Sequence, residues 1–354
     1  MTLTIADREI GKDRPPFIIA EMSGNHNQSL ERALSIVDAV AKTGADAIKL
    51  QTYTADTLTL KSNSPDFKIN DSSNLWDGST LHDLYNKAHT PWNWHKEIFN
   101  RARDHGLICF SSPFDESAVD FLEELNVPAY KIASFENNHI PLIRKVASTS
   151  KPLIISTGMA KISELELAVE TAKEHGCKDL ILLKCTSTYP ASPVNSNIRT
   201  IPHMKNLFNC EIGLSDHTLG LGVATSAIAV GATVIEKHFT LSRKEGGIDS
   251  QFSLEPDEFS QLVIESKRSW ESLGDINYGP TKDEESSKIF RRSIFASKNI
   301  KKGEKFTKKN IKRIRPGYGL EPKYYEKLLG KKSPLDISRA NPLKKIVIKK
   351  LKIN

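Results

Sequence analysis

Short apolar runs alternate with amphipathic segments from residue 17 to residue 274. Each run ends in a polar cluster, and the segments between the runs repeat apolar residues at i, i+3 and i+4, the spacing of a helix with one buried face. The runs predict eight strands, at residues 17–22, 47–53, 107–114, 129–134, 152–159, 180–190, 211–218 and 233–240. The segments predict eight helices, at residues 29–44, 91–106, 116–125, 140–148, 162–176, 201–208, 220–231 and 255–274.

This order of elements predicts a closed (β/α)8 TIM barrel. Strands that are apolar along their whole length belong to a parallel sheet buried on both faces. Eight strand–helix units in about 270 residues match the size of the barrel. An open, doubly wound sheet is the alternative, but no GxGxxG sequence follows the first strand to favour it.

Two segments depart from the alternation. Residues 2–10, together with the chain after Lys12, predict a small hairpin that turns near Gly11 and Asp13. Residues 54–90 form a Ser- and Asn-rich insertion with a short helix near residues 81–88. Long insertions of this kind commonly cover a functional site.

The composition changes beyond Gly274. We predict a barrel domain over residues 1–280, a charged linker over 281–290, and a compact, mostly β module over 291–354. From residue 291 onward the chain carries 21 Lys and Arg against four acidic residues, whereas the whole chain has a net charge of +7. The module is therefore strongly basic and the rest is acidic. A basic module can contact nucleic acid, an acidic partner or an anionic substrate; here the acidic barrel is the evident partner.

The remaining composition favours a soluble protein without a membrane partner. The mean hydropathy is −0.39, and no apolar run approaches the roughly 18 residues that span a bilayer. The N-terminus lacks the apolar region of a signal peptide, so a cytoplasmic location is expected. Four cysteines without CxxC spacing suggest free thiols. We expect Cys109 and Cys185, in predicted strands, to be small core residues.

In a barrel, the carboxyl ends of all strands meet at one face, where catalytic residues lie. The polar residues at the predicted strand ends are Glu21, Asn25, His26, Lys49, Gln51, Thr52, Ser111, Ser112, Lys131, Ser134, Glu136, Ser156, Thr157, Lys184, Thr186, Ser187, Tyr189, Ser215, Asp216, His217, Glu236, Lys237 and His238. Lysines and small hydroxyl residues around one cavity suit an anion with several oxygens, such as phosphate with carboxylate. Alternatively, some of the lysines pair with the glutamates, and we expect this for at least one.

His217 and His238 occupy matched places after neighbouring strands. Strands lie about 4.8 Å apart, so both imidazoles can reach one divalent cation, which polarises a carbonyl as a Lewis acid. Alternatively, they are unrelated polar residues at the starts of loops. Glu21 and Glu136 are candidates for proton transfer. Asp249, in EGGIDS, could hold substrate hydroxyls or serve only the turn.

The motifs resemble those of the sialic acid synthase family, which condenses phosphoenolpyruvate with an amino-sugar aldehyde. The similar stretches, in chain order, are IAEMSGNHNQ, KLQTYTAD, FSSPFD, PAYKIAS, IISTGMA, KCTSTYP, GLSDHT, IEKHFT and then RPGYG in a module like the antifreeze-like (SAF) domain. Within the family the chain looks closest to the pseudaminic acid synthase branch. Sialic acid synthases usually have His and Asn where this chain has Lys184 and Ser187, and Thr at Ser112, which favours a 2,4-diacetamido-2,4,6-trideoxy hexose over N-acetylmannosamine.

The resemblance implies roles for individual residues. Phosphoenolpyruvate would contact Lys49, Ser112, Lys131, Ser134, Ser156, Ser187 and Ser215, and the sugar or water would face Glu21, Gln51, Glu136, Tyr189 and Asp249. His217 and His238 would bind Mn²⁺ or Mg²⁺. Arg315 would reach the sugar site of a partner subunit in a domain-swapped homodimer.

The implied reaction begins when the cation polarises the open-chain aldehyde and C3 of phosphoenolpyruvate attacks it. Water then adds to C2, and the intermediate expels phosphate with C–O cleavage. Legionaminic and N-acetylneuraminic acid synthases are the enzymatic alternatives. The other alternative is a non-enzymatic protein that binds nucleic acid or ice through its basic module, although the module lacks regularly interleaved aromatic residues, and no nucleic acid partner is expected.

Overall fold

The computed structural model describes residues 2–70 and 75–353. Residues 71–74 of the predicted insertion, and the terminal residues 1 and 354 of the predicted domains, lie outside the described residues. The chain divides into two compact units, Met1–Gly274 and Asp275–Asn354. In the described chain, no helix combines the length and apolar character needed to cross a membrane.

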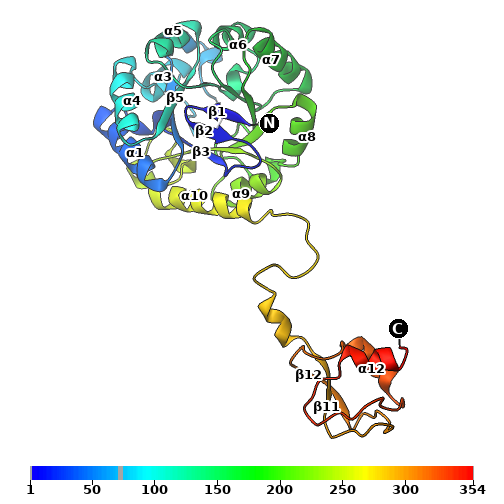
Figure 1. The fold of residues 1–354 in the computed structure, drawn as a ribbon. Helices are drawn as coiled ribbons and strands as arrows, with labels where there is room; N and C mark the ends of the chain where they lie inside the picture. The colour runs from blue at the N-terminus through cyan, green and yellow to red at the C-terminus, as the bar shows by residue number, and fades with distance from the viewer. Residues whose placement is uncertain (1, 71–74, 354) are drawn as a thin grey trace. The chain divides into compact units, whose positions relative to one another are not determined.

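Eight parallel strands of the first unit close into a barrel (Figure 1). In order around the barrel they are β3 (Phe17–Glu21), β4 (Ala47–Thr52), β5 (Ile108–Pro113), β6 (Tyr130–Ile132), β7 (Leu153–Ser156), β8 (Leu180–Cys185), β9 (Glu211–Asp216) and β10 (Val234–His238). β10 closes the ring by pairing with β3, with Ile235 opposite Ile18. The predicted closed barrel is confirmed, and the open sheet is excluded.

Helices surround the barrel, as Figure 1 shows. The helices that follow the strands are α1 (Leu30–Thr43), α4 (His95–Asp104), α5 (Glu116–Glu124), α6 (Ile140–Ala147), α7 (Ile162–Glu174), α8 (Thr200–Phe208), α9 (Gly222–Ala229) and α10 (Pro256–Glu271). The insertion between β4 and α4 holds α2 (Ala55–Leu58) and α3 (Leu81–Ala88). The helix ends follow local chemistry: the Ser29 side chain accepts from the Arg32 N–H at the start of α1, and Gly44, with φ 83°, ends it.

The pleat of the strands separates two cores. Side chains alternate between the two faces of a strand, so Ile18 and Ala20 pack outward with the helices while Phe17 and Ile19 pack inside the barrel. The inner cluster also contains Ala47, Phe110, Ala129, Ile154, Ile181, Leu183 and Val234. These inner apolar positions lie toward the beginnings of the strands. The inner positions at the strand ends are polar and build the site described below.

A two-stranded hairpin, β1 (Leu3–Ile5) and β2 (Arg8–Ile10), precedes the barrel. Its side chains Leu3, Ile5 and Ile10 join the inner cluster, so the hairpin closes the amino-terminal end of the barrel. The predicted turn near Gly11 and Asp13 is wrong. The hairpin turns earlier, at Ala6, which takes a positive φ of 51° that its residue type does not suggest.

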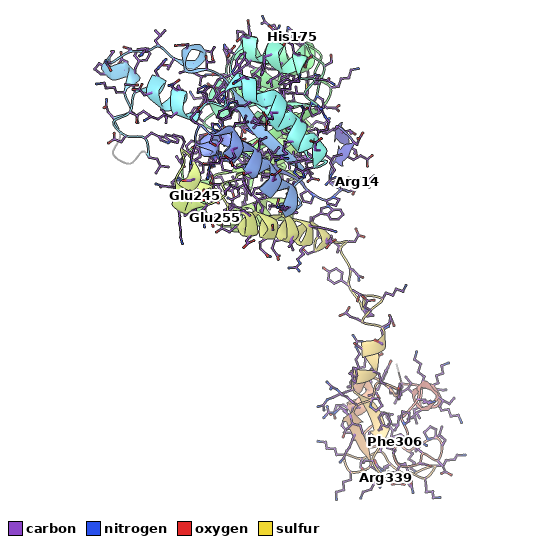
Figure 2. The ribbon with its side chains drawn as sticks, turned by 90° about the vertical axis from the view of Figure 1, so that its left-hand side faces the viewer. Arg14, His175, Glu245, Glu255, Phe306 and Arg339 are labelled. Atoms are coloured by element: carbon purple, nitrogen blue, oxygen red, sulfur yellow. The ribbon has the colours of Figure 1, made fainter. Side chains whose placement is uncertain are left out.

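The second unit has its own small core. Its antiparallel strands β11 (Ser293–Ala296) and β12 (Ile311–Ile314) are supplemented by isolated bridges and by the short helices α11 (Tyr325–Leu328) and α12 (Lys345–Lys350). Phe306, labelled in Figure 2, is fully buried in this core, together with Ile294, Ile311, Leu328 and Leu343.

Candidate active site

Two buried lysines lie on the inner face of the barrel, near the middle of β4 and β6. The Lys49 ammonium group contacts Glu21 and lies 3.7 Å from Glu236 Oε2, while Lys131 Nζ lies 3.4 Å from Glu236 Oε1. The expected pairing of lysines with glutamates is therefore confirmed. Two ammonium groups share these carboxyl groups in a buried setting, where electrostatic attraction for an anion is much stronger than in water.

Hydroxyl groups surround the two lysines. Lys49 Nζ donates to Ser112 Oγ at 3.2 Å, and Lys131 Nζ donates to Ser156 Oγ at 2.7 Å. Ser215 Oγ donates to Glu236 Oε1 at 2.8 Å. The structure thus brings Ser112, Ser156 and Ser215 to the lysine pair, where they can complete the coordination of a multi-oxygen anion.

Gly158, just after β7, allows two more hydroxyls to approach. Its N–H donates to Ser134 Oγ at 3.1 Å. A Cβ atom at this position would lie 2.1 Å from Ser187 Oγ and 2.6 Å from Ser134 Oγ, so a larger residue would displace both. Ser134, Gly158 and Ser187 therefore form a compact group of hydrogen-bonding atoms beside Ser156, and the absence of a side chain on Gly158 makes it possible.

Glu21 and Glu236 have opposite protonation preferences although both contact Lys49. Burial raises the pKa of Glu21, and the charge of Glu236 adds to this effect. Burial also disfavours the charged form of Glu236, but Lys131 and Lys49 outweigh it and lower the pKa of that carboxyl. A pair of carboxyl groups with separated pKa values is typical of acid–base chemistry.

His217 and His238 lie side by side, with ring centroids 5.3 Å apart. His217 Nδ1 lies 3.0 Å from the Thr186 carbonyl oxygen, which can only accept, so Nδ1 carries a proton. Burial opposes the charged form of this imidazole, but Cys185, the Thr186 carbonyl and Glu236 outweigh it and raise the pKa of His217. Burial and the neighbouring positive charges lower the pKa of His238, which is therefore neutral. Its buried Nδ1 has no hydrogen-bond partner among the described residues and lies 3.6 Å from Asp249 Oδ2.

The histidine pair suits a divalent cation by its chemistry. Two imidazoles with a carboxylate nearby form a donor set that Mn²⁺ accepts when both rings are neutral, whereas Mg²⁺ prefers oxygen ligands alone. The unsatisfied His238 Nδ1 is an atom that a cation or a water could occupy. Within the described residues, no group of three or more His, Cys, Asp or Glu side chains is already arranged to hold a metal, so substrate or water would have to supply the remaining ligands.

A cavity of about 340 Å³ opens beside His238. Gln51 donates to Glu21 Oε1 at 3.0 Å and to Ser23 Oγ at 3.2 Å, and Ser23 in turn contacts Asp249. Tyr189 packs on His217 with ring centroids 4.6 Å apart and also lines the cavity. Gln51, Asp249 and Tyr189 thus stand together at the mouth of the barrel, above the lysine cluster.

Glu136 lines the same cavity after β6. Burial raises the pKa of its carboxyl to about 7, and the positive charge of Lys131 only partly opposes this. Its Oε2 is buried and has no hydrogen-bond partner within the described residues. A group of this kind can hold or release a proton near neutral pH.

Not every polar strand-end residue faces the cavity. Thr52, Ser111, Lys184, Asp216 and Lys237 stand at alternate positions and point toward the helices. Lys184 Nζ, for example, donates to Cys185 O at 2.8 Å, and Lys237 Nζ donates to Asp216 Oδ2 at 2.7 Å. The expectation that Lys184 joins the anion pocket is therefore wrong. Its neighbours in the strand, Leu183 and Cys185, occupy the inner face instead.

Arg315 belongs to the second unit, where it is exposed after β12.

The roles of three residues near the site were not foreseen in full from the sequence. Glu236 was included among the strand-end residues and as a possible partner for lysines, and its position two residues before His238 places it on the same face. Cys185 is buried, as expected, and its Sγ also lies 3.9 Å from His217 Nδ1 and 3.8 Å from Ser187 Oγ. Alternation along the strand could have revealed the place of Cys185 beside His217. Ser23 follows the end of β3 with a positive φ of 47°, and no pattern indicated its contact with Asp249.

The fold and site define the class of protein: an enzyme with a (β/α)8 barrel built around a buried anion pocket and a neighbouring histidine pair. A family model described as the NeuB family matches residues 36–278, and a SAF domain model matches residues 291–345. The first match covers more than half of the chain. The chain belongs to the NeuB family.

Individual relatives agree with this assignment. The chain is 47% identical over 332 residues to a pseudaminic acid synthase from Campylobacter jejuni, covering 94% of this chain and 96% of that protein. It is 36% identical over 319 residues to an N,N'-diacetyllegionaminic acid synthase from the same species, covering 89% and 95%. Among solved structures, the N-acetylneuraminic acid (sialic acid) synthetase from Leptospira borgpetersenii, in complex with citrate, matches with a TM-score of 0.72 at 31% identity, covering 81% and 95%.

Proposed function

We propose that the chain is a pseudaminic acid synthase, which condenses phosphoenolpyruvate with the open-chain form of 2,4-diacetamido-2,4,6-trideoxy-L-altrose and releases phosphate. The observation that carries the proposal is the 47% identity to a pseudaminic acid synthase along almost the entire length of both chains. The N,N'-diacetyllegionaminic acid synthase of the same species is less similar, at 36% identity. The precursor of legionaminic acid is therefore the second candidate substrate.

Phosphoenolpyruvate binds at the lysine cluster. Lys49 and Lys131 neutralise its phosphate and carboxylate, and the hydroxyls of Ser112, Ser134, Ser156, Ser187 and Ser215 bind the remaining oxygens. The short distances from Lys49 to Ser112 and from Lys131 to Ser156 support this role. A bound anion would take over contacts that Glu21 and Glu236 now make with the lysines.

The sugar occupies the cavity above. Gln51, Tyr189 and Asp249 bind its polar groups, and Arg315 of a partner subunit completes the site in a domain-swapped homodimer. When bound at His217 and His238, Mn²⁺ or Mg²⁺ would supply Lewis acid polarisation of the aldehyde. The two imidazoles favour Mn²⁺ of the two ions.

The residues of the chain manage the protons of the reaction. C3 of phosphoenolpyruvate forms a bond with the aldehyde carbon, whose oxygen takes a proton and becomes a hydroxyl. Water adds to C2 and loses a proton, and the C2–O bond to phosphate breaks, so that phosphate leaves with the bridging oxygen. Glu21 and Glu136, whose pKa values are raised by burial, can hold and transfer these protons.

The test is to incubate the purified protein with phosphoenolpyruvate, Mn²⁺ and one candidate hexose at a time, measuring phosphate release and product mass. We expect the trideoxy altrose derivative to be turned over in preference to N-acetylmannosamine and the legionaminic acid precursor. Preference for either of the others refutes the proposed substrate. Phosphoenolpyruvate labelled with ¹⁸O at the bridging position should deliver the label to phosphate; label retained in the sugar acid contradicts C–O cleavage.

The unpaired, buried state of all four cysteines supports the cytoplasm as the place of this reaction.

A further inference from the structure

The lining of the cavity beside His238 comes from two parts of the chain. The barrel and its loops contribute the polar residues Ser23, Gln51, Ser134, Glu136, Tyr189, His238 and Asp249, together with Tyr53, Phe114, Ala133, Phe135 and Ile248. The insertion between β4 and α4 contributes a set of mostly apolar residues. It contributes Leu58, Ile69, Trp76, Leu81, Leu84, Tyr85 and Ala88. We call this second set the apolar wall.

Helix α3 presents one regular face to the cavity. Leu81, Leu84, Tyr85 and Ala88 follow the i, i+3, i+4, i+7 spacing of a single helix face. Leu84 and Ala88 are each only 8% exposed, whereas Asn86, between them, is exposed and is not among the lining residues. The apolar face of α3 is therefore directed at the cavity.

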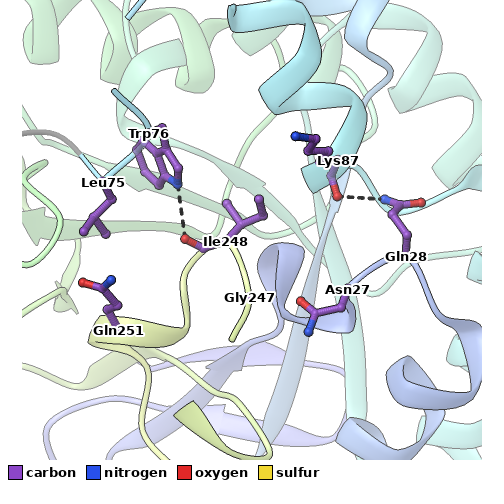
Figure 3. Close-up of a pocket in the computed structure, with 8 residues that line it drawn as sticks. All are labelled: Asn27, Gln28, Leu75, Trp76, Lys87, Gly247, Ile248 and Gln251. Carbon is purple, nitrogen blue, oxygen red and sulfur yellow. Dashed lines mark hydrogen bonds between the residues drawn. The ribbon is translucent and has the colours of Figure 1, made fainter. Parts of the chain in front are cut away.

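The apolar wall is tied to the barrel on both sides. The Trp76 indole N–H donates to the Ile248 carbonyl oxygen at 3.2 Å, next to Asp249 (Figure 3). Gln28 Nε2 donates to Lys87 O at 3.0 Å and to the His89 carbonyl at 2.6 Å, just beyond α3. The first bond ties the insertion to the loop that follows β10, and the bonds from Gln28 tie the end of α3 to the loop that follows β3. The wall is thus positioned together with the residues that bind the polar groups of the substrate.

Two residues of the cavity lining also face a second space. Trp76 and Ile248 line a second pocket, of about 400 Å³, which Figure 3 shows. Asn27, Gln28 and Gln251 also line this second pocket. Polar groups are therefore available within a short distance of Trp76, whereas the described residues of the insertion that line the cavity contribute aliphatic side chains and the Trp76 and Tyr85 rings.

The apolar wall cannot bind phosphoenolpyruvate, because the phosphate and carboxylate of that substrate need charged and hydrogen-bonding partners. It must therefore face the second substrate. A sugar hydroxyl directed at Leu81, Leu84 or Ala88 would lose its hydrogen bonds to water without replacement, whereas a methyl group would gain contact area. The groups that fit are the methyl of a 6-deoxy carbon and the methyls of acetamido groups.

We propose that the face of α3 formed by Leu81, Leu84, Tyr85 and Ala88 is a specificity determinant that selects a deoxygenated, N-acylated hexose over one with a free hydroxymethyl group. This inference rests on the proposed function and deepens it. It assigns selection of the substrate's methyl groups to the insertion and recognition of its polar groups to the barrel.

The experiment compares kcat/KM for the trideoxy diacetamido hexose and for N-acetylmannosamine, which has a hydroxyl at C6. We expect the wild type to favour the trideoxy sugar by at least about tenfold, because the two sugars differ at C4 and C6 and even one small group in an apolar pocket changes the rate about 10- to 200-fold. Leu84→Ala should lower kcat/KM for the trideoxy sugar by about 10- to 100-fold, lower it less for N-acetylmannosamine, and leave KM for phosphoenolpyruvate unchanged.

Two further variants serve as controls. Asn86→Ala, on the exposed side of the same helix, should change neither preference nor rate. Leu84→Met, of similar volume, should retain the preference, which separates the role of the wall from general damage to the insertion. Equal losses for both sugars in Leu84→Ala, or a raised KM for phosphoenolpyruvate, would overturn the inference.

Failure of the proposed function would give a different experimental result. If the wild type turns over neither sugar, the proposed reaction is wrong, and calorimetric titration of both sugars into the phosphoenolpyruvate-loaded protein then tests the wall directly. Weaker binding of the trideoxy sugar to Leu84→Ala than to wild type supports the wall. Equal binding of the two sugars by the wild type contradicts it.

Discussion

At the scale of single residues, burial decides which carboxyl groups carry protons. Glu236 lies between two lysines, which lower its pKa and keep it ionised. The pKa values of Glu21 and Glu136 are raised, because burial disfavours their charged forms more than the nearby lysines favour them. Glu136 differs from Glu21 in that it has no direct ion pair with a lysine among the described residues. Its titration near pH 7 therefore reflects the cavity rather than a specific partner.

The titration of Glu136 should be visible in the kinetics. Below pH 7 the carboxyl is protonated and can donate a hydrogen bond or a proton to the sugar; above pH 7 it loses this ability. We expect log kcat/KM of the wild type to decline above pH 7, and the Glu136→Gln variant to have a slope smaller by about one unit, because an amide donates at every pH. Glu166→Gln, an exposed position on α7, is the control and should reproduce the wild-type profile. An undiminished slope in Glu136→Gln would exclude this role.

At the scale of elements, a buried ion pair joins the strands that carry the two histidines. Lys237 is completely buried and donates to Asp216 Oδ2 at 2.7 Å and to Thr218 O at 2.6 Å. Asp216 Oδ1 accepts from the Thr218 N–H and hydroxyl. Asp216 directly precedes His217, and Lys237 directly precedes His238. Because neighbouring residues point to opposite faces, this pair on the outer face sets the spacing of the histidines on the inner face.

Variants of the Asp216–Lys237 pair should change the unfolding free energy and the affinity for metal to different degrees. Lys237→Met alone leaves a buried, uncompensated carboxylate and should cost about 3–5 kcal/mol of unfolding free energy. Asp216→Asn combined with Lys237→Met removes both charges and should recover much of that loss. We expect the double variant still to bind Mn²⁺ about 10- to 100-fold more weakly than wild type, measured by electron paramagnetic resonance, as for other residues that orient metal ligands. His217→Ala gives the reference for lost binding. Wild-type affinity in the double variant would show that the pair serves stability alone.

Two further histidines connect the helices to the barrel. His95, at the start of α4, accepts from the Thr52 hydroxyl through Nε2 at 2.8 Å, since its Nδ1 donates to the Pro91 carbonyl at 3.2 Å. His26 packs edge-on against Trp94. Burial lowers the pKa of both imidazoles to about 4. Both are therefore neutral parts of the layer between strands and helices.

The lowered pKa of His95 should make the barrel sensitive to acid. The pKa of His95 in the unfolded chain is 6.5. Above this pH the imidazole is neutral in both the folded and the unfolded chain, so the unfolding free energy does not depend on it. As the pH falls from 6.5 toward 4, the unfolded chain takes up a proton that the folded barrel excludes, so stability falls. For His95 the loss between pH 7 and pH 5 is about 2 kcal/mol. Denaturant titrations at these two pH values give the unfolding free energy of both proteins. Between pH 7 and pH 5, we expect the value for wild type to fall further than the value for His95→Gln, by this amount. An identical decline in both proteins would contradict the assigned ionisation.

At the scale of the whole molecule, the chain combines an acidic barrel with a basic second unit. The second unit carries Arg315 in an exposed position, and the cavity beside His238 belongs to the first unit. Opposite net charges favour association of the two kinds of unit, although salt screens the attraction beyond about 8 Å. A swapped dimer would use this attraction to complete each site with an arginine from the other chain.

Mixed dimers can test the exchange of Arg315. His217→Ala and Arg315→Ala should each be nearly inactive alone. When the two variants are co-expressed, a mixed dimer contains one intact barrel facing an intact Arg315, so random pairing should restore roughly a quarter of wild-type activity. If Arg315 serves the barrel of its own chain, no activity returns. Wild-type activity in Arg315→Ala alone would remove the residue from the site altogether.

Much of this site was predictable because a strand alternates strictly between two faces. The positions of Lys49, Lys131, His217 and His238 follow from the strand ends of a (β/α)8 barrel, and the same rule applied more strictly would have excluded Lys184. The turn of the first hairpin was not predictable, because Ala6 adopts a positive φ that only the packing of Leu3 and Ile10 into the barrel stabilises.

The sequence by itself determined the barrel, the order of its strands and the set of polar residues at its carboxyl end, because hydrophobic periodicity is a local property of the chain. The tertiary structure decided which of those residues meet. Closure of β10 on β3 brings Glu236 and Glu21 to the same lysine, and the insertion supplies an apolar wall of the cavity. Ion pairs, shifted pKa values and cavity walls depend on distances between segments far apart in the chain, and only the folded backbone sets those distances.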